Sequence, residues 1–145
     1  MTAEAEVLEE LKRLRARLPQ LSGALAASVD GLVVAQDAET VEAETVAALT
    51  AAALSVAQRL SDATRQGGFR ELLVHGEHGY VATYAAGRAA VLLLLAEPRT
   101  NVGRLHLEGR RAGARIGELV DGVLERMPRQ QLSPISRPMM RPPRP

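Results

Sequence analysis

The chain has 145 residues, no cysteine and a formal net charge of +1 at neutral pH. This length fits a single domain that can bury a core without help from metals or disulfides. The absence of cysteine excludes disulfide frameworks, thiolate zinc sites and cysteine nucleophiles. The balanced charge and the presence of only three aromatic residues argue against a protein built mainly to hold nucleic acid.

The N-terminal part of the sequence predicts a helix followed by a β-hairpin. Apolar residues recur at three- and four-residue steps over residues 3–18, as in an amphipathic helix, and Pro19 ends the pattern. In the segment GALAASVDGLVVAQ, residues 23–36, an Asp-Gly pair separates two apolar runs. Because glycine adopts positive φ without strain, this pair predicts a tight turn between strands at 21–28 and 32–36.

A second, long helix is predicted over residues 40–66, ended by a pair of glycines. This helix is apolar on more than one face: a stripe at helical spacing (Val46, Leu49, Ala53, Val56, Leu60, Ala63) runs beside a second surface (Ala47, Ala48, Ala51, Ala52, Leu54). One interpretation is simply the high helix propensity of alanine. The other is a helix that packs on its own sheet and also on another chain.

The remaining elements are three strands and a last helix. Strands are predicted at 69–75, 80–86 and 89–96, joined by glycine-containing turns. The first of them carries charges and is expected at an edge, whereas the unbroken apolar run of 89–96 is expected to be central and covered on both faces. The last helix is predicted from Thr100 or Asn101 to about residue 126.

Three glycines at four-residue steps, Gly109, Gly113 and Gly117, lie on one face of that last helix. Each costs roughly 1 kcal/mol of helix propensity relative to alanine. We therefore expect close approach of this helix to the sheet.

The order of elements is α-β-β-α-β-β-β-α, which predicts an α+β fold with a five-stranded, mostly antiparallel sheet and helices on both faces. Residues 1–126 are predicted to form this domain. Residues 127–145 are rich in arginine and proline and contain no acidic residue, so they are expected to be a disordered tail. The charged N-terminus has no apolar signal segment, and residues 89–96 are too short to span a membrane. We expect a cytoplasmic protein without stable membrane insertion.

No catalytic or cofactor motif is present in the sequence. The run His75-Gly76-Glu77-His78 falls on a tight turn, where the two histidines would not converge on a metal. The glycine-rich segments lack the spacing of phosphate-binding loops. These observations favour a protein that binds partners, with no enzyme activity, cofactor or metal.

The sequence resembles the Roadblock/dynein light chain family, in particular its bacterial, actinobacterial-type branch. The resemblance rests on the hairpin GALAASVDGLVVAQ, the alanine-rich helix ending in ATRQGGF, the strand pair FRELLVHGEHGYVATYAAG, and the apolar segment AAVLLLLAEPRTNVGRLHLEGRRAG. It covers about residues 11–124. It implies a profilin-like or longin-like sheet, and homodimers in which the third strands pair edge to edge and the second helices pack together.

The resemblance also implies partners and a mechanism. Members bind Ras-like small GTPases and regulate their nucleotide cycle, or act as adaptors, and actinobacterial relatives accompany a sensor-kinase-like protein and a small GTPase. Carried onto this sequence, the dimer contact would use Phe69, Glu71, Leu73, Val46, Leu49, Ala53, Val56 and Leu60, and the GTPase platform would use Ala47, Thr50, Ala51 and Leu54. Which face of the second helix serves which partner stays open.

Two other interpretations remain at this point. A structural scaffold subunit would bind its partners irrespective of their nucleotide. A small-molecule sensor domain would need convergent polar groups in its interior, and the alanine- and leucine-rich pattern offers few of them.

Overall fold

The computed structural model describes residues 2–39 and 41–126, so the predicted tail at 127–145 lies outside the described residues. The elements follow the predicted order: α1 (Ala3–Arg17), β1 (Leu21–Ser28), β2 (Val33–Asp37), α2 (Ala43–Ala63), β3 (Glu71–Gly76), β4 (Gly79–Ala86), β5 (Ala90–Ala96) and α3 (Val102–Arg126). They build the expected α+β fold. None of these described helices is long and apolar enough to cross a membrane.

The five strands form one sheet in the order β2-β1-β5-β4-β3, and every neighbouring pair is antiparallel. The prediction of a central, doubly covered strand is confirmed, because β5 lies in the middle and its residues 90–94 are buried. The prediction of an edge is also confirmed, because β3 bonds to β4 on one side and to no other described strand. β2 forms the opposite edge.

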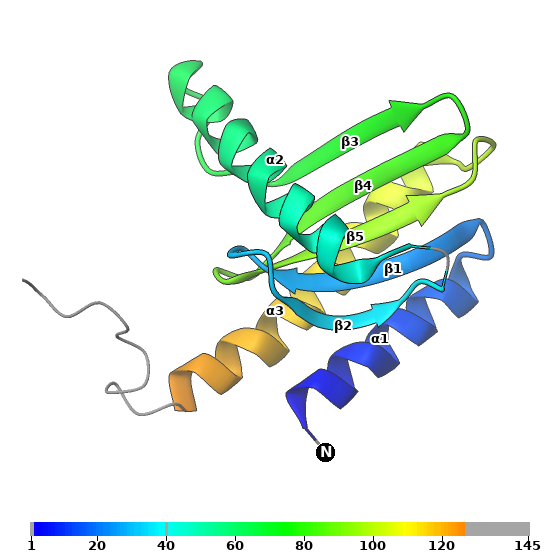
Figure 1. Cartoon of the computed structure of the whole chain (residues 1–145), viewed down its shortest axis with the longest axis horizontal. Coiled ribbons are helices and arrows are strands. Elements are labelled where there is room, and N and C mark those ends of the chain that lie inside the picture. The colour runs from blue at the N-terminus through cyan, green and yellow to red at the C-terminus, as the bar shows by residue number, and fades with distance from the viewer. Residues whose placement is uncertain (1, 40, 127–145) are drawn as a thin grey trace, which may run out of the picture.

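Helices cover both faces of the sheet. Figure 1 shows α1 and α3 side by side on one face and α2 crossing the other. The core is divided accordingly. The larger cluster lies between the sheet and α1 and α3, and includes Leu11, Leu92 and Ile116; the smaller cluster lies under α2 and includes Leu25, Ala47 and Leu93. Successive side chains of β1 and β5 point alternately into the two clusters, so neither strand shows a polar face.

α3 approaches β4 closely, as its glycine spacing predicted. A Cβ atom at Gly113 would lie 2.9 Å from the carbonyl oxygen of Ala85, and one at Gly117 would lie 2.8 Å from the carbonyl carbon of Ala86. A Cβ at Gly109 would overlap the ring of Tyr84. The helix therefore sits on the strand at a distance that only glycine permits at these positions.

Both ends of α2 and the start of β3 differ from the prediction by two or three residues, for local reasons. α2 begins at Ala43 and ends at Ala63, with Arg65 in the left-handed region at φ 60° where a helix cannot continue. β3 begins at Glu71, two residues later than predicted. The amide of Phe69 donates to the side-chain oxygen of Gln58 at 2.9 Å, and the Phe69 ring packs beneath α2 instead of joining the strand.

Candidate interaction surface

The outer face of α2 carries a stripe of large apolar side chains that nothing described in the chain covers. Leu49, Val56 and Leu60 are 65%, 67% and 65% exposed, and Ala53 is exposed between them. We call Leu49, Ala53, Val56 and Leu60 the outer stripe. Isolated exposed leucines are common on soluble proteins, but four apolar positions in register along one helix form a continuous patch. Such a patch is typical of an interface.

The inner face of α2 packs on the chain's own sheet, and three of the four residues predicted for the GTPase platform lie on this face. Ala47, Thr50 and Leu54 are buried, and the Thr50 hydroxyl donates to the backbone carbonyl of Val46 at 2.7 Å. Their side chains are therefore not accessible to a partner in this conformation. Ala51, the fourth predicted platform residue, is half-buried at the flank and faces the β1–β2 turn. Small residues face inward because they let the helix lie close to the sheet.

The other predicted dimer residues do not share one surface: Phe69, Glu71 and Leu73 lie on or just before β3, whereas Val46 lies near the start of α2. Leu73 packs towards α1 and α3, whereas Phe69 packs beneath α2, so the two side chains lie on opposite faces of the sheet. Val46 is half-buried at the base of α2 beside the inner cluster. On β3, Val74 is 51% exposed and lies opposite Val81 on the α2 face of the sheet. An open strand edge thus lies next to a helix with an uncovered apolar stripe.

A polar network that sequence reasoning missed ties this edge strand to α3. The Nδ1 atom of His106 lies 2.8 Å from the Tyr84 hydroxyl and 3.1 Å from a carboxylate oxygen of Glu71. Arg110 donates to the other Glu71 oxygen at 2.8 Å. The predicted dimer residue Glu71 therefore bonds within its own chain. A signal was present in Tyr84, an aromatic residue in a buried strand whose hydroxyl needs a partner.

Burial raises the pKa of the Tyr84 hydroxyl, and the nearby Glu71 carboxylate raises it further, against a smaller opposing effect of Arg110. The unfolded tyrosine titrates near pH 10. The contribution of this group to stability is therefore complete below about pH 10 and is lost as the pH rises towards the native pKa.

We expect Tyr84→Phe to reduce the loss of stability at alkaline pH. The wild-type free energy of unfolding should fall by up to about 1.4 kcal/mol per pH unit above pH 10 through this one group, and the variant should lack that contribution. At neutral pH the variant should be less stable by about 1 kcal/mol, because one buried hydrogen bond is lost. Urea unfolding at a series of pH values measures both effects. Equal alkaline slopes for the two proteins would contradict the assignment.

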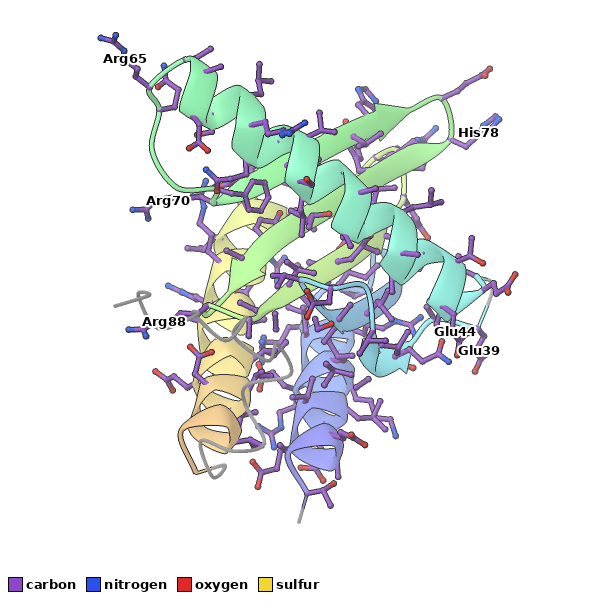
Figure 2. All side chains as sticks on the ribbon, turned by 60° about the vertical axis from the view of Figure 1, so that its left-hand side comes forward. Glu39, Glu44, Arg65, Arg70, His78 and Arg88 are labelled. Carbon is purple, nitrogen blue, oxygen red and sulfur yellow. The ribbon has the colours of Figure 1, made fainter. Side chains whose placement is uncertain are left out.

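A hollow of about 330 Å³ opens where α2 meets the β4–β5 turn. Its lining is mostly apolar, with Val29, Leu54 and Phe69 on its walls and Arg88 at the turn, from which that side chain projects in Figure 2. The Arg88 amide points to the Asp121 carboxylate of α3. Within the described residues, no three histidine, aspartate or glutamate side chains gather to hold a metal. The hollow offers few convergent polar groups for a small ligand.

Comparison with known proteins identifies a family and several structures that share this fold. The Roadblock/LC7 domain matches residues 7–96. The fold superposes on the gliding protein MglB from Thermus thermophilus with a TM-score of 0.77 at 21% identity, covering 84% of this chain and 93% of that one. A Roadblock/LC7 domain from Streptomyces avermitilis gives a TM-score of 0.70 at 22% identity, covering 81% and 97% of the two chains. Profilin IB from Acanthamoeba castellanii gives 0.53 at 16% identity, covering 80% and 97%.

At these identities the structural likeness establishes the fold, which includes the profilin-like architecture expected from the sequence. No curated protein shows significant similarity to the chain. The family match includes α1 from residue 7 onward, the hairpin, α2 and the sheet through β5, which is more than half of the sequence. The chain therefore belongs to the Roadblock/LC7 family.

Proposed function

We propose that this protein is a non-enzymatic regulator or adaptor that forms a homodimer and binds a Ras-like small GTPase. Its role would be to modulate the nucleotide cycle or the location of that GTPase in the cytoplasm, within a bacterial signalling system that includes a sensor-kinase-like protein. The observation that carries the proposal is the outer stripe of α2 beside the free edge of β3. Family membership and the sequence resemblance support the choice of partner.

Self-association through β3 accounts for both features at once. Two β3 edges paired antiparallel about a two-fold axis would continue the sheet from one protomer into the next. The two α2 helices would then lie on the same side of the joined sheet, where their outer stripes could cover each other. Burying Leu49, Val56 and Leu60 in this way would remove the large exposed apolar side chains of α2 from water.

The GTPase contact is proposed for the surface beside the paired α2 helices. The burial of Ala47, Thr50 and Leu54 excludes direct contact by those side chains in this conformation. Ala51 instead lines the hollow near the β4–β5 turn, together with Ser55 and Arg88. A GTPase seated there would meet apolar surface and one cation. Regulation would follow from preference for one nucleotide state, since a ligand shifts an equilibrium only by its difference in affinity for the two states.

The test is capture of partners on immobilised full-length protein from lysate of the cells that produce it. One sample contains a slowly hydrolysed GTP analogue and the other contains GDP. We expect a small GTPase to be retained in one nucleotide state and released in the other. Ser55→Arg places a bulky charge at the hollow. This variant should fail to capture the GTPase while the protein itself stays dimeric.

Two outcomes would contradict the proposal in different ways. Capture of the same partners in both nucleotide states would favour a structural scaffold subunit. The absence of any GTPase from both samples would leave the family membership as a statement about fold. Sedimentation of the same preparation shows separately whether the dimer forms.

A further inference from the structure

The outer surface of the α1–α3 layer has an uneven distribution of charge that neither dimerisation nor GTPase binding uses. Ion pairs join four arginines of the two helices to three glutamates in one network (Arg13, Arg17, Arg111, Arg115; Glu9, Glu10, Glu108). A fifth arginine, Arg104, donates to the backbone carbonyl of Arg17 at 3.2 Å. Lys12 is exposed close by on α1. Cations are therefore in excess at the end of the layer where α1 ends and α3 begins.

Two of the glutamates lie beneath the arginines. The side chains of Glu10 and Glu108 are only 5% and 15% exposed, whereas those of Arg13 and Arg111 are 63% and 60% exposed. Glu10 accepts from Arg115 at 2.6 Å and lies within 3.6 Å of Arg17. These two carboxylates thus hold the guanidinium groups from below. Glu9, whose side chain is 50% exposed, is the one glutamate of the network that faces solvent, beside Arg13, so the groups that face solvent are mainly cationic. Neutralisation inside the network does not remove this outward positive surface.

An exposed leucine lies among these cations. Leu107 is 46% exposed on α3, three residues after Arg104 and four residues before Arg111, which places the three side chains on neighbouring turns of one helix face. Long arginine side chains keep their charged ends in water or among head groups while their stems cover apolar surface. A leucine surrounded by arginines is the arrangement found where a helix lies on an anionic lipid surface.

The charge changes sign along the same layer. The start of α1 and the second half of α3 carry the acidic side chains of Glu4, Glu6, Glu118 and Asp121. The helices run in opposite directions, since Arg17 contacts Glu108 while Glu10 contacts Arg115. Both acidic segments therefore lie at the same end of the layer. This polarity would confine contact with an anionic surface to the basic end.

We propose that the surface formed by Arg13, Arg17, Arg104, Leu107 and Arg111 binds the anionic head groups of a phospholipid bilayer. In the proposed dimer, on which this step rests, pairing of two β3 edges places both α1–α3 layers on the same side of the joined sheet, opposite the α2 helices. Figure 1 shows that α1 and α3 lie on the face of the sheet away from α2. Two basic surfaces facing one way fit an extended flat target such as a bilayer, and leave the α2 side free for a GTPase.

The experiment is co-sedimentation of the full-length protein with vesicles. One set contains phosphatidylcholine alone, and the other contains phosphatidylcholine mixed with phosphatidylglycerol. We expect binding to the mixed vesicles only, and weaker binding as salt is added. The double variant Arg13→Gln/Arg111→Gln should bind the mixed vesicles roughly 30-fold more weakly. Each basic residue near an anionic membrane surface strengthens binding by roughly fivefold, and the variant lacks two of them. Leu107→Gln should weaken binding at high salt as well as at low salt.

A matched control removes two exposed arginines from the opposite side of the molecule. Arg59→Gln/Arg65→Gln loses the same charge from α2 and the residues that follow it, and should bind like the wild type. Equal binding of both double variants, or no preference of the wild type for the mixed vesicles, would overturn the proposal. A monomeric variant should keep the lipid preference at lower affinity, so failure of the dimer is distinguished from failure of the lipid surface. Circular dichroism confirms that each variant is folded.

Discussion

The substitution Ala53→Arg is expected to convert the proposed homodimer into a monomer. Ala53 is exposed in the middle of the outer stripe, so arginine can be accommodated in the isolated protomer without changing its core. In a dimer joined by two α2 helices, the substitution would bury two unpaired charges against apolar side chains. Burying a charge without a partner costs several kcal/mol. We expect the dissociation constant to rise by at least about a hundredfold, as measured by sedimentation velocity over a range of concentrations.

The control for this experiment is Ala16→Arg. Ala16 is also an exposed alanine in a helix, but it lies on α1, away from α2 and β3. This substitution adds the same side chain and charge, and the dissociation constant of the variant dimer should equal that of the wild type. A dimer that survives Ala53→Arg would exclude the outer stripe from the interface. A change of thermal stability in the monomeric variant at low concentration would show instead that the protomer itself was damaged.

The substitution Gly117→Ala is expected to cause a large loss of stability, although alanine is the better helix former. A Cβ atom at this position would lie 2.8 Å from both the carbonyl carbon of Ala86 and the Cα of Gly87, which are backbone atoms that cannot rotate away. α3 would have to move off the β4–β5 turn. Overpacking of this kind costs up to about 3 kcal/mol, against a propensity gain of about 1 kcal/mol. We expect a net loss of about 2 kcal/mol, seen as a lower midpoint in urea unfolding.

Gly103→Ala provides the matched control on the same helix. A Cβ at Gly103 would meet only the Asn101 side-chain oxygen at 3.4 Å, which is almost an ordinary contact. Here the propensity gain should prevail and the midpoint should stay the same or rise slightly. If both variants were equally stable, the close approach of α3 to the sheet would not limit which residues fit at these positions.

The order of elements and the roles of the strands could be predicted because their signals are local. The Asp-Gly pair marked the β1–β2 turn, and Gly31 does adopt a positive φ of 92° there. The apolar run of β5 predicted burial on both faces, and β5 lies at the centre of the sheet, where both of its faces are covered. The charges of β3 indicated an edge. Each of these inferences depends on a few neighbouring residues and on the general need to cover apolar surface and pair backbone groups.

The assignment of the two apolar faces of α2 could not be made in the same way. Helical periodicity shows that two faces exist, but it does not say which of them meets the sheet. The structure turns the small Ala47 and Thr50 inward and leaves the larger Leu49 and Val56 exposed. An expectation that the largest side chains seek the core would have given the reverse. Only the packing distance between α2 and the sheet, a property of the whole fold, decides the question.

The network of Tyr84, His106 and Glu71 escaped prediction for a related reason. These residues lie on β4, α3 and β3 and are distant in sequence. Each has an ordinary interpretation by itself: a core aromatic, a helix histidine and a charge on an edge strand. Their convergence depends on the register of β3 against β4, which pairs Glu71 with Tyr84, and on the close approach of α3. No local pattern reports those two quantities.

The pairing of β1 with β5 also has a consequence for how the chain is made. β1 forms its central ladder with a strand that is synthesised only after α2, β3 and β4. Until β5 leaves the ribosome, the apolar faces of the β1–β2 hairpin have no sheet to join, and α2 has no complete surface to cover. The β3–β4–β5 meander, by contrast, has only local pairings and can form as it emerges. The nascent N-terminal half is therefore the stage of biogenesis most exposed to aggregation and most dependent on chaperones.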